Sequence, residues 1–144
     1  MKILVFGPEA RYNAYRPAFA SALDAELVFC PLGNSPRRAA ADHPDAQVLF
    51  ADPIIDVDRE IIGLLPQLKL IQSEGVAFNR IDLEAARERG IYVCNNKGCN
   101  ADSVAEHTIM LMLMALRHGI TGHRAVLAGQ QVQMKEAVMA SSSP

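Results

Sequence analysis

The chain has 144 residues and a mass of 15.7 kDa, a length that fits one domain of ordinary size. Half of its residues are hydrophobic and 21% are charged, which is typical of a globular protein and excludes a disordered one. The formal net charge of −2 excludes a strongly basic nucleic-acid binder, and nothing in the sequence indicates a membrane partner. The three cysteines are odd in number and the N-terminus turns polar too early for a signal peptide, so we expect reduced thiols in a cytoplasmic protein.

Short apolar runs alternate along the chain with stretches of helical spacing. The runs predict strands over residues 3–6, 26–30, 48–50, 68–71 and 91–94. They are β-branched and apolar on both sides of the alternation, which is typical of parallel strands covered on both faces. The alternation therefore predicts an α/β fold, an open, doubly wound parallel sheet of about five strands with right-handed crossovers.

Helices are predicted between these strands. The first is indicated by the spacing of Tyr15, Phe19 and Leu23. The starts of the next three are marked by residues that favour N-caps: Ser35 before Pro36, then Asp56 or Asp58, and then Asp82. A long helix over 101–118 follows the last strand, and a further helix is predicted within 119–133.

Ligands of such sheets bind at the carboxyl ends of the strands, so the turns there are candidate sites. The turn over 73–77 follows the fourth strand, and Gly75 lets a ligand approach its backbone closely. Successive free N–H groups in a turn of this kind form a cradle for an anion such as a carboxylate. The alternative is an ordinary turn that needs Gly75 for its dihedral angles.

A second candidate is Asn100, which lies just before the long helix, where the helix field favours an anion. Its amide can donate to a ligand, or it can cap the helix. Ser103 and Glu106 fit a capping box at the same end, and His107, one turn further, is expected to satisfy a buried hydrogen bond. The spacing of cysteines and histidines matches no zinc pattern, so no metal site is predicted.

The helix over 101–118 is nearly all apolar after Thr108. A helix that is apolar on all sides must be buried on all sides, and a domain of this size has few places to do that. We therefore expect a partner surface, and we predict a homodimer through residues 104–116.

Residues 68–118 resemble the D-isomer-specific 2-hydroxyacid dehydrogenases. The segment NADSVAEH at 100–107 carries the resemblance, and the Gly75 turn and the segment IDLEAA at 81–86 support it. The resemblance implies a flavodoxin-like substrate domain over 1–100, an interdomain-type helix with a following helical segment over 101–135, and a tail over 136–144. It also implies that Glu74, Gly75 and Val76 hold the carboxylate of a 2-hydroxy or 2-keto acid, and that Asn100 lies on the substrate side.

Members of this family use NAD or NADP, bound by a domain that opens with G-x-G-x-x-G. None of the nine glycines begins that pattern. The family's catalytic arginine, glutamate and histidine belong to the same missing region, so no residue here is assigned a catalytic or cofactor-binding role. The sequence thus predicts the substrate-binding part of an oxidoreductase, inactive alone and binding no cofactor alone. The sequence also departs from the family at Ala77, Asn79 and Lys97, which leaves the identity of the acid open.

Two other classes compete with this interpretation. A receiver-like module is one, because Asp52 follows the third strand where receivers carry a phosphate acceptor, with Ser73 and Lys97 after later strands. Against it, the turn after the first strand lacks the acidic pair that holds magnesium. A protein-interaction module built on the apolar helix is the other.

Overall fold

The computed structural model describes residues 1–13 and 24–140, and the side chains of all of these except 136–140. The chain divides into two compact units, Met1–Cys99 and Asn100–Pro144. The predicted helix carrying Tyr15, Phe19 and Leu23 lies outside the described residues, as do the last four residues of the predicted tail.

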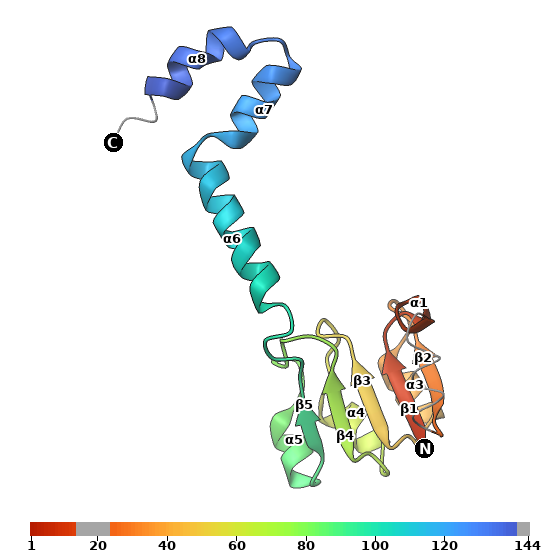
Figure 1. Ribbon diagram of the computed structural model, residues 1–144. Coiled ribbons are helices and arrows are strands. Elements are labelled where there is room, and N and C mark those ends of the chain that lie inside the picture. The colour runs from red at the N-terminus through yellow and green to blue at the C-terminus, as the bar shows by residue number, and fades with distance from the viewer. Residues whose placement is uncertain (14–23, 141–144) are drawn as a thin grey trace. The chain divides into compact units, whose positions relative to one another are not determined.

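The first unit is built on a five-stranded parallel sheet with the order β2-β1-β3-β4-β5 (Figure 1). Its strands are β1 (Lys2–Phe6), β2 (Glu26–Cys30), β3 (Val48–Ala51), β4 (Leu70–Ser73) and β5 (Tyr92–Cys94). This is the flavodoxin-like order, so the predicted fold class is confirmed. The register pairs Ala51 at the end of β3 with Ser73 at the end of β4. The residues that follow these two strands therefore emerge side by side.

The fourth strand begins two residues later than the apolar run 68–71 predicts. Leu68 is buried in the core, but its N–H donates to the carbonyl oxygen of Leu65 in the turn after the preceding helix. The sheet ladder starts only when the Lys69 N–H reaches the Gln47 carbonyl. Hydrophobicity reports the burial of Leu68 correctly, but it does not report the hydrogen bonding that sets where the strand begins.

Three helices of the first unit begin at the predicted caps. They are α3 (Pro36–Asp42), α4 (Arg59–Leu64) and α5 (Leu83–Glu88). The side chains of Ser35, Asp58 and Asp82 each accept a hydrogen bond from the N–H three residues ahead. Of the two alternatives for α4, the cap is therefore Asp58 and not Asp56.

Both faces of the sheet are packed. On one face, residues of α3, α4 and α5 such as Ala40, Ile62 and Ala86 join Leu4, Leu49 and other strand residues in the larger core. On the other face, Tyr12 of α1 (Glu9–Asn13) packs with Ile3, Val5 and Val48. The short, two-sided apolar strands of the sequence thus have the burial that a parallel sheet requires.

The second unit contains α6 (Ala101–Leu116), α7 (Gly119–Leu127) and α8 (Gln131–Ala140). The predicted helix over 101–118 stops two residues early, because His118 has a left-handed backbone with φ of 52°. Where one helix was predicted within 119–133, the chain forms two, because the positive φ of Gly129 ends the helical conformation there. Within the described residues, no helix is both long enough and apolar enough to cross a membrane.

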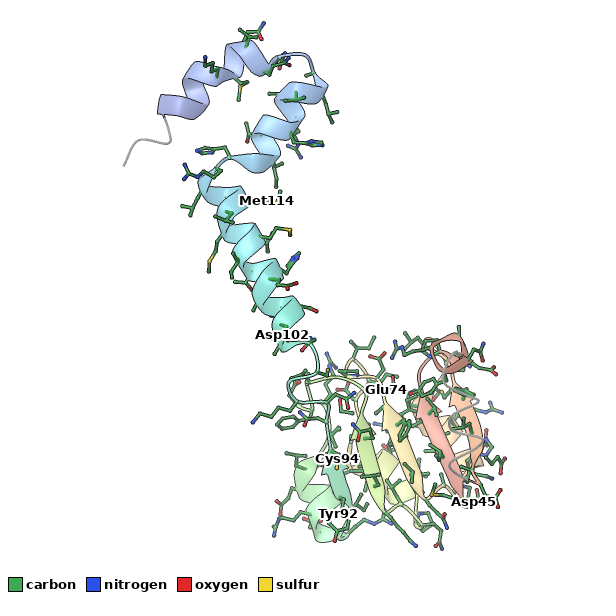
Figure 2. All side chains as sticks on the ribbon, viewed as in Figure 1. Asp45, Glu74, Tyr92, Cys94, Asp102 and Met114 are labelled. Atoms are coloured by element: carbon green, nitrogen blue, oxygen red, sulfur yellow. The ribbon has the colours of Figure 1, made fainter. Side chains whose placement is uncertain are left out.

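The start of α6 differs from the predicted capping box. Asn100 occupies the N-cap position and Ser103 lies inside the first turn, so Ser103 and Glu106 do not form the box. No residue of α6 is buried, and Figure 2 shows side chains projecting all around it. Most of its large apolar side chains, including Val104, Leu113 and Leu116, are between 44% and 70% exposed, and Met114 is of intermediate burial.

Candidate functional site

The candidate site lies in the turns that leave the carboxyl ends of β1, β3, β4 and β5. Figure 2 shows Glu74 at this end of the sheet, whereas Asp45 and Tyr92 lie near the opposite end. The turn after β4, from Glu74 to Ala77, is held between the turn after β3 on one side and the turn after β5 on the other. The contacts with these two turns set the directions of its backbone N–H and carbonyl groups.

Three successive carbonyl oxygens of this turn are bound by two asparagines that follow β5. The side-chain amide of Asn96 donates to the Glu74 carbonyl (2.9 Å), and its backbone N–H donates to the Gly75 carbonyl (2.9 Å). The side-chain amide of Asn95 donates to the Val76 carbonyl (2.7 Å). All three carbonyls therefore point toward the segment after β5.

The direction of these carbonyls fixes the direction of three N–H groups. In a trans peptide the N–H points opposite to the carbonyl of the same peptide unit, and none of the described peptide bonds is cis. The N–H groups of Gly75, Val76 and Ala77 thus point away from Asn95 and Asn96. In the described part of the chain they donate no hydrogen bond. Successive free N–H groups that share a direction are suited to bind an anion, and the role of this turn toward a carboxylate stays a prediction.

Gly75 is required by a close approach of the neighbouring turn. A Cβ added to Gly75 would lie 2.5 Å from Cγ of Pro53, which follows β3. Atoms of this kind pack at about 3.5–4.0 Å, so any side chain here would push the two turns apart. Gly75 does not have a positive φ, so the alternative that the turn needs glycine for its dihedral angles is wrong. The lack of a side chain instead permits the close packing against Pro53 and leaves the N–H groups uncovered.

An ionic cluster of one arginine and two buried carboxylates lies next to the turn after β4. Nη1 of Arg11 in α1 lies 2.8 Å from Oδ2 of Asp52 and 2.5 Å from Oε2 of Glu74. The two carboxylate side chains are only 9% and 10% exposed, whereas that of Arg11 is 44% exposed. Oε1 of Glu74 is buried with no hydrogen-bond partner among the described residues. Burial raises the pKa of Glu74 above its ordinary value, although the contact with Arg11 opposes this, and the two carboxylates raise the pKa of Arg11.

The structure brings Glu74, Gly75 and Val76 together in one turn but gives them different tasks. The Glu74 N–H donates to the Ala51 carbonyl, so it belongs to the sheet, and the Glu74 side chain pairs with Arg11. The N–H groups available to a ligand are those of Gly75, Val76 and also Ala77. Sequence reasoning missed the supporting roles of Asn95, Asn96 and Arg11. The two adjacent asparagines after the fifth strand were the available signal, because neighbouring parallel strands end at the same edge.

Asn100 begins the second unit, at the N-cap position of α6. Its side chain makes no capping hydrogen bond, while its carbonyl accepts from the Val104 N–H. Of the two alternatives, side-chain capping of the helix is therefore not what the structure has. The amide group is not used for capping, and its role toward a substrate stays a prediction.

The receiver-like interpretation gains no support at Asp52. Its Oδ1 accepts the Ile54 N–H (3.2 Å) and its Oδ2 pairs with Arg11, so both oxygens of this buried carboxylate are used. Ser73 is also buried, and its hydroxyl donates to the Ala77 carbonyl (2.6 Å). Within the described residues, no group of three or more histidine, cysteine or acidic side chains is arranged to hold a metal ion.

The described residues do not fit a dinucleotide. Sheets of this kind bind its pyrophosphate at a glycine-rich turn between a strand and a helix. Here Gly7, after β1, faces the Glu74 carboxylate, since a Cβ on Gly7 would lie 3.5 Å from Oε2. This turn has Gly7 alone, followed by Pro8, and is not glycine-rich, so it offers no cradle for a pyrophosphate. A hollow of about 380 Å³ at the end of β2, lined by residues such as Cys30 and Arg38, is remote from the Gly75 turn in the fold and has no glycine-rich turn in its lining.

The chain is similar to several dehydrogenases. It is 36% identical over 135 residues to D-3-phosphoglycerate dehydrogenase of Archaeoglobus fulgidus, covering 94% of this chain and 25% of the relative. It is 36% identical over 88 residues to formate dehydrogenase 1 of Saccharomyces cerevisiae, covering 60% of this chain and 23% of the relative. The chain thus spans about a quarter of the length of these two relatives.

Solved structures of dehydrogenases also match this chain. The NAD-dependent formate dehydrogenase of Staphylococcus aureus in complex with NAD matches with a TM-score of 0.72 and 31% identity, over 90% of this chain and 41% of that one. The D-lactate dehydrogenase of Aquifex aeolicus, complexed with NAD and lactic acid, shares the fold with a TM-score of 0.74 at 20% identity, over 89% of this chain and 38% of that one.

The family model that describes the catalytic domain of D-isomer specific 2-hydroxyacid dehydrogenases matches residues 3–143, almost the whole chain. The strand order agrees with the flavodoxin-like fold that the resemblance implied. The chain therefore belongs to the D-isomer specific 2-hydroxyacid dehydrogenase family, as a catalytic domain of that family.

Proposed function

We propose that this chain binds the carboxylate of a 2-hydroxy or 2-keto acid for an NAD- or NADP-dependent oxidoreductase reaction. The observation that carries the proposal is the set of three unused N–H groups at Gly75, Val76 and Ala77, which point away from the asparagines after β5. A carboxylate has two oxygens with several acceptor positions, so it can accept from all three groups. Hydrogen bonds to an ionised acceptor are about twice as strong as neutral ones.

The surroundings of the cradle suit a small organic acid. Val76 is an exposed apolar residue of the same turn, Phe78 directly follows this turn and is also exposed, and Ile54 is an exposed apolar residue of the turn after β3. Apolar side chains beside a few fixed polar groups are the usual composition of a small-molecule site. The backbone groups grip the acid end, and these side chains are available to contact the rest of the molecule. Asn100 is proposed as a further donor to the substrate.

The 144-residue chain is proposed to bind acid without oxidising it. Oxidation of the hydroxyl carbon needs a bound nicotinamide to take the hydride and a base to take the proton. The described residues do not fit the dinucleotide, and none is placed as that base. We expect no turnover by these residues alone with NAD or NADP and 2-hydroxy acids. A rate that scales with the amount of purified chain would overturn this expectation.

Nuclear magnetic resonance of the ¹⁵N-labelled chain tests acid binding directly. Titration with D-lactate, pyruvate and D-3-phosphoglycerate is expected to shift the amide signals of Gly75, Val76 and Ala77 first. A Kd on the order of 1 mM corresponds to a small ligand held by a few hydrogen bonds. The matched control is lactamide, which has the same shape as lactate but no charge, and is expected to bind more weakly. Shifts confined to other parts of the chain would contradict the proposal.

We also propose that α6 packs against a second copy of this chain. None of its residues is buried, and from Thr108 to Leu116 it carries no charged side chain, so two copies can approach without repulsion between like charges. Leu113→Glu is expected to shift a dimer to monomer in light scattering, whereas Gln131→Glu in α8 is expected to leave it unchanged. A wild-type chain that stays monomeric at high concentration would refute the dimer. We also propose a cytoplasmic location, which the three free cysteines support, because thiols stay reduced in that compartment.

A further inference from the structure

We propose that Arg11 is a positioning residue for acid binding: it holds the Glu74 side chain and neutralises its charge, so that the N–H groups of Gly75, Val76 and Ala77 can receive an anion. This inference rests on the proposed function of the turn. Arg11 follows the first strand, as the candidate turns follow theirs, but it lies 63 positions before Glu74 along the chain. It is the fold that brings the two together.

The geometry ties two neighbouring turns to one cation. Ala51 and Ser73 are register partners at the ends of β3 and β4, and each is followed directly by an acidic residue, Asp52 and Glu74. Like charges at adjacent places repel each other, and burial weakens the screening by water. Nη1 of Arg11 contacts both carboxylates and is the cation that the described residues place between them. Loss of Arg11 leaves two buried negative charges facing each other.

The charge of Glu74 matters to a ligand because Gly75 is the next residue. An uncompensated carboxylate beside the cradle repels the carboxylate of the substrate and opposes its binding. Oε1 of Glu74 is buried with no partner among the described residues, so this side chain has no second donor to replace Arg11. Arg11 therefore acts on the substrate through Glu74, without touching the substrate itself.

The position of Glu74 also controls the backbone. The Glu74 N–H is part of the sheet, and the Glu74 carbonyl is held by Asn96. The Arg11 contact fixes the side chain that lies between these two anchors. A shift of the side chain toward water, which two unpaired carboxylates would favour, pulls on the peptide that carries the Gly75 N–H. Charge and position thus have the same consequence for the anion.

The experiment compares Arg11→Gln, Glu74→Gln and the double variant, titrated with D-lactate and with lactamide and followed by NMR. Arg11→Gln is expected to weaken lactate binding about tenfold, a change of about 1.4 kcal/mol. Its effect on lactamide is expected to be small, because this ligand has no charge. Glu74→Gln serves as the reference for the double variant: without the Glu74 charge, the loss of Arg11 is expected to change lactate affinity little, so the double variant is expected to regain most of the lactate affinity that Arg11→Gln loses.

Two controls separate positioning from a general loss of structure. Arg59→Gln removes an arginine from the exposed pair with Glu88, away from the turn, and is expected to leave lactate affinity unchanged. Amide hydrogen exchange without ligand gives a second readout, in which Arg11→Gln is expected to speed the exchange of Gly75, Val76 and Ala77 more than that of the core strands. If Arg11→Gln unfolds the chain, the double variant, which lacks the unpaired Glu74 charge, serves in its place.

The outcomes distinguish the two proposals. If the wild type binds lactate and Arg11→Gln binds it equally well, the positioning role is wrong and the proposed function stands. If the wild type binds none of the acids but Arg11→Gln still changes exchange in the turn, the proposed function fails and the mechanical role of Arg11 stands. Equal losses for lactate and lactamide would overturn the electrostatic part of the inference.

Discussion

Replacement of Gly75 by alanine is the sharpest test of how the turn after β4 is built. The new Cβ would lie 2.5 Å from Cγ of Pro53, against an ordinary contact of about 3.5–4.0 Å. One turn must therefore move by about 1 Å relative to the other. The proline ring is rigid and attached to the backbone, so the movement cannot be absorbed by a rotamer change. Overpacking of this kind costs about 1–3 kcal/mol.

The matched control is Gly63→Ala in α4. A Cβ at Gly63 has no heavy atom within 4 Å, so it meets no obstacle. Alanine is the better helix former by about 0.5–1 kcal/mol, so this variant is expected to be more stable than the wild type. Replacement of glycine by alanine is thus expected to lower stability at position 75 and to raise it at position 63.

A double-mutant cycle with Pro53→Ala isolates the contact. Alanine at 53 removes Cγ and leaves Cβ, which would lie 3.6 Å from the new methyl group of Ala at 75, an ordinary contact. The two substitutions are expected to couple favourably, by on the order of 1 kcal/mol. Urea unfolding followed by far-ultraviolet circular dichroism is suitable, because the chain has no tryptophan to report by fluorescence. A Gly75→Ala variant as stable as the wild type, with no coupling to Pro53→Ala, would refute the reasoning.

Three further changes probe the site and its scaffold. Burial raises the pKa of Glu74 above its ordinary value of 4.5, so the wild type loses stability as the pH rises through the raised pKa and the buried side chain ionises. Glu74→Gln does not ionise, so it is expected to gain stability relative to the wild type as the pH increases. A difference between the two urea midpoints that stays constant with pH would argue against this. Asn95→Ala combined with Asn96→Ala releases the Glu74 and Val76 carbonyls, and is expected to weaken lactate binding on the order of tenfold in the NMR titration, whereas Asn34→Ala, in the turn after β2, is expected to have no effect. Asp58→Ala removes the cap that accepts the Ile61 N–H and is expected to cost about 1 kcal/mol in urea unfolding while lactate affinity stays the same.

Much of the fold follows from local patterns that the chain displays openly. The strand β1 has a two-sided apolar run, and the caps Ser35, Asp58 and Asp82 mark helix starts because a short polar side chain there satisfies an N–H group. Such signals involve residues a few positions apart, so a sequence can show them.

The site was predictable only in part, because its contacts join residues far apart in the chain. Gly75 and Val76 were found through the turn after a strand, but the partners that orient them, Asn95 and Asn96, come about twenty residues later. Glu74 was predicted to hold the carboxylate, and the pairing of its side chain with Arg11 was not foreseen. The capping box at Ser103 was wrong because the motif fits several starting positions, and the helix begins two residues before it.

Recognition by the main chain has a consequence for how a protein of this kind can change its preference. The groups proposed to grip the acid are amides that every residue except proline possesses, and they are aimed by two asparagines outside the turn. Val76 and Phe78 can therefore be exchanged for larger, smaller or charged residues without dismantling the grip. One backbone arrangement of this sort is able to bind acids of very different size, and the side chains around it then determine which acid is preferred.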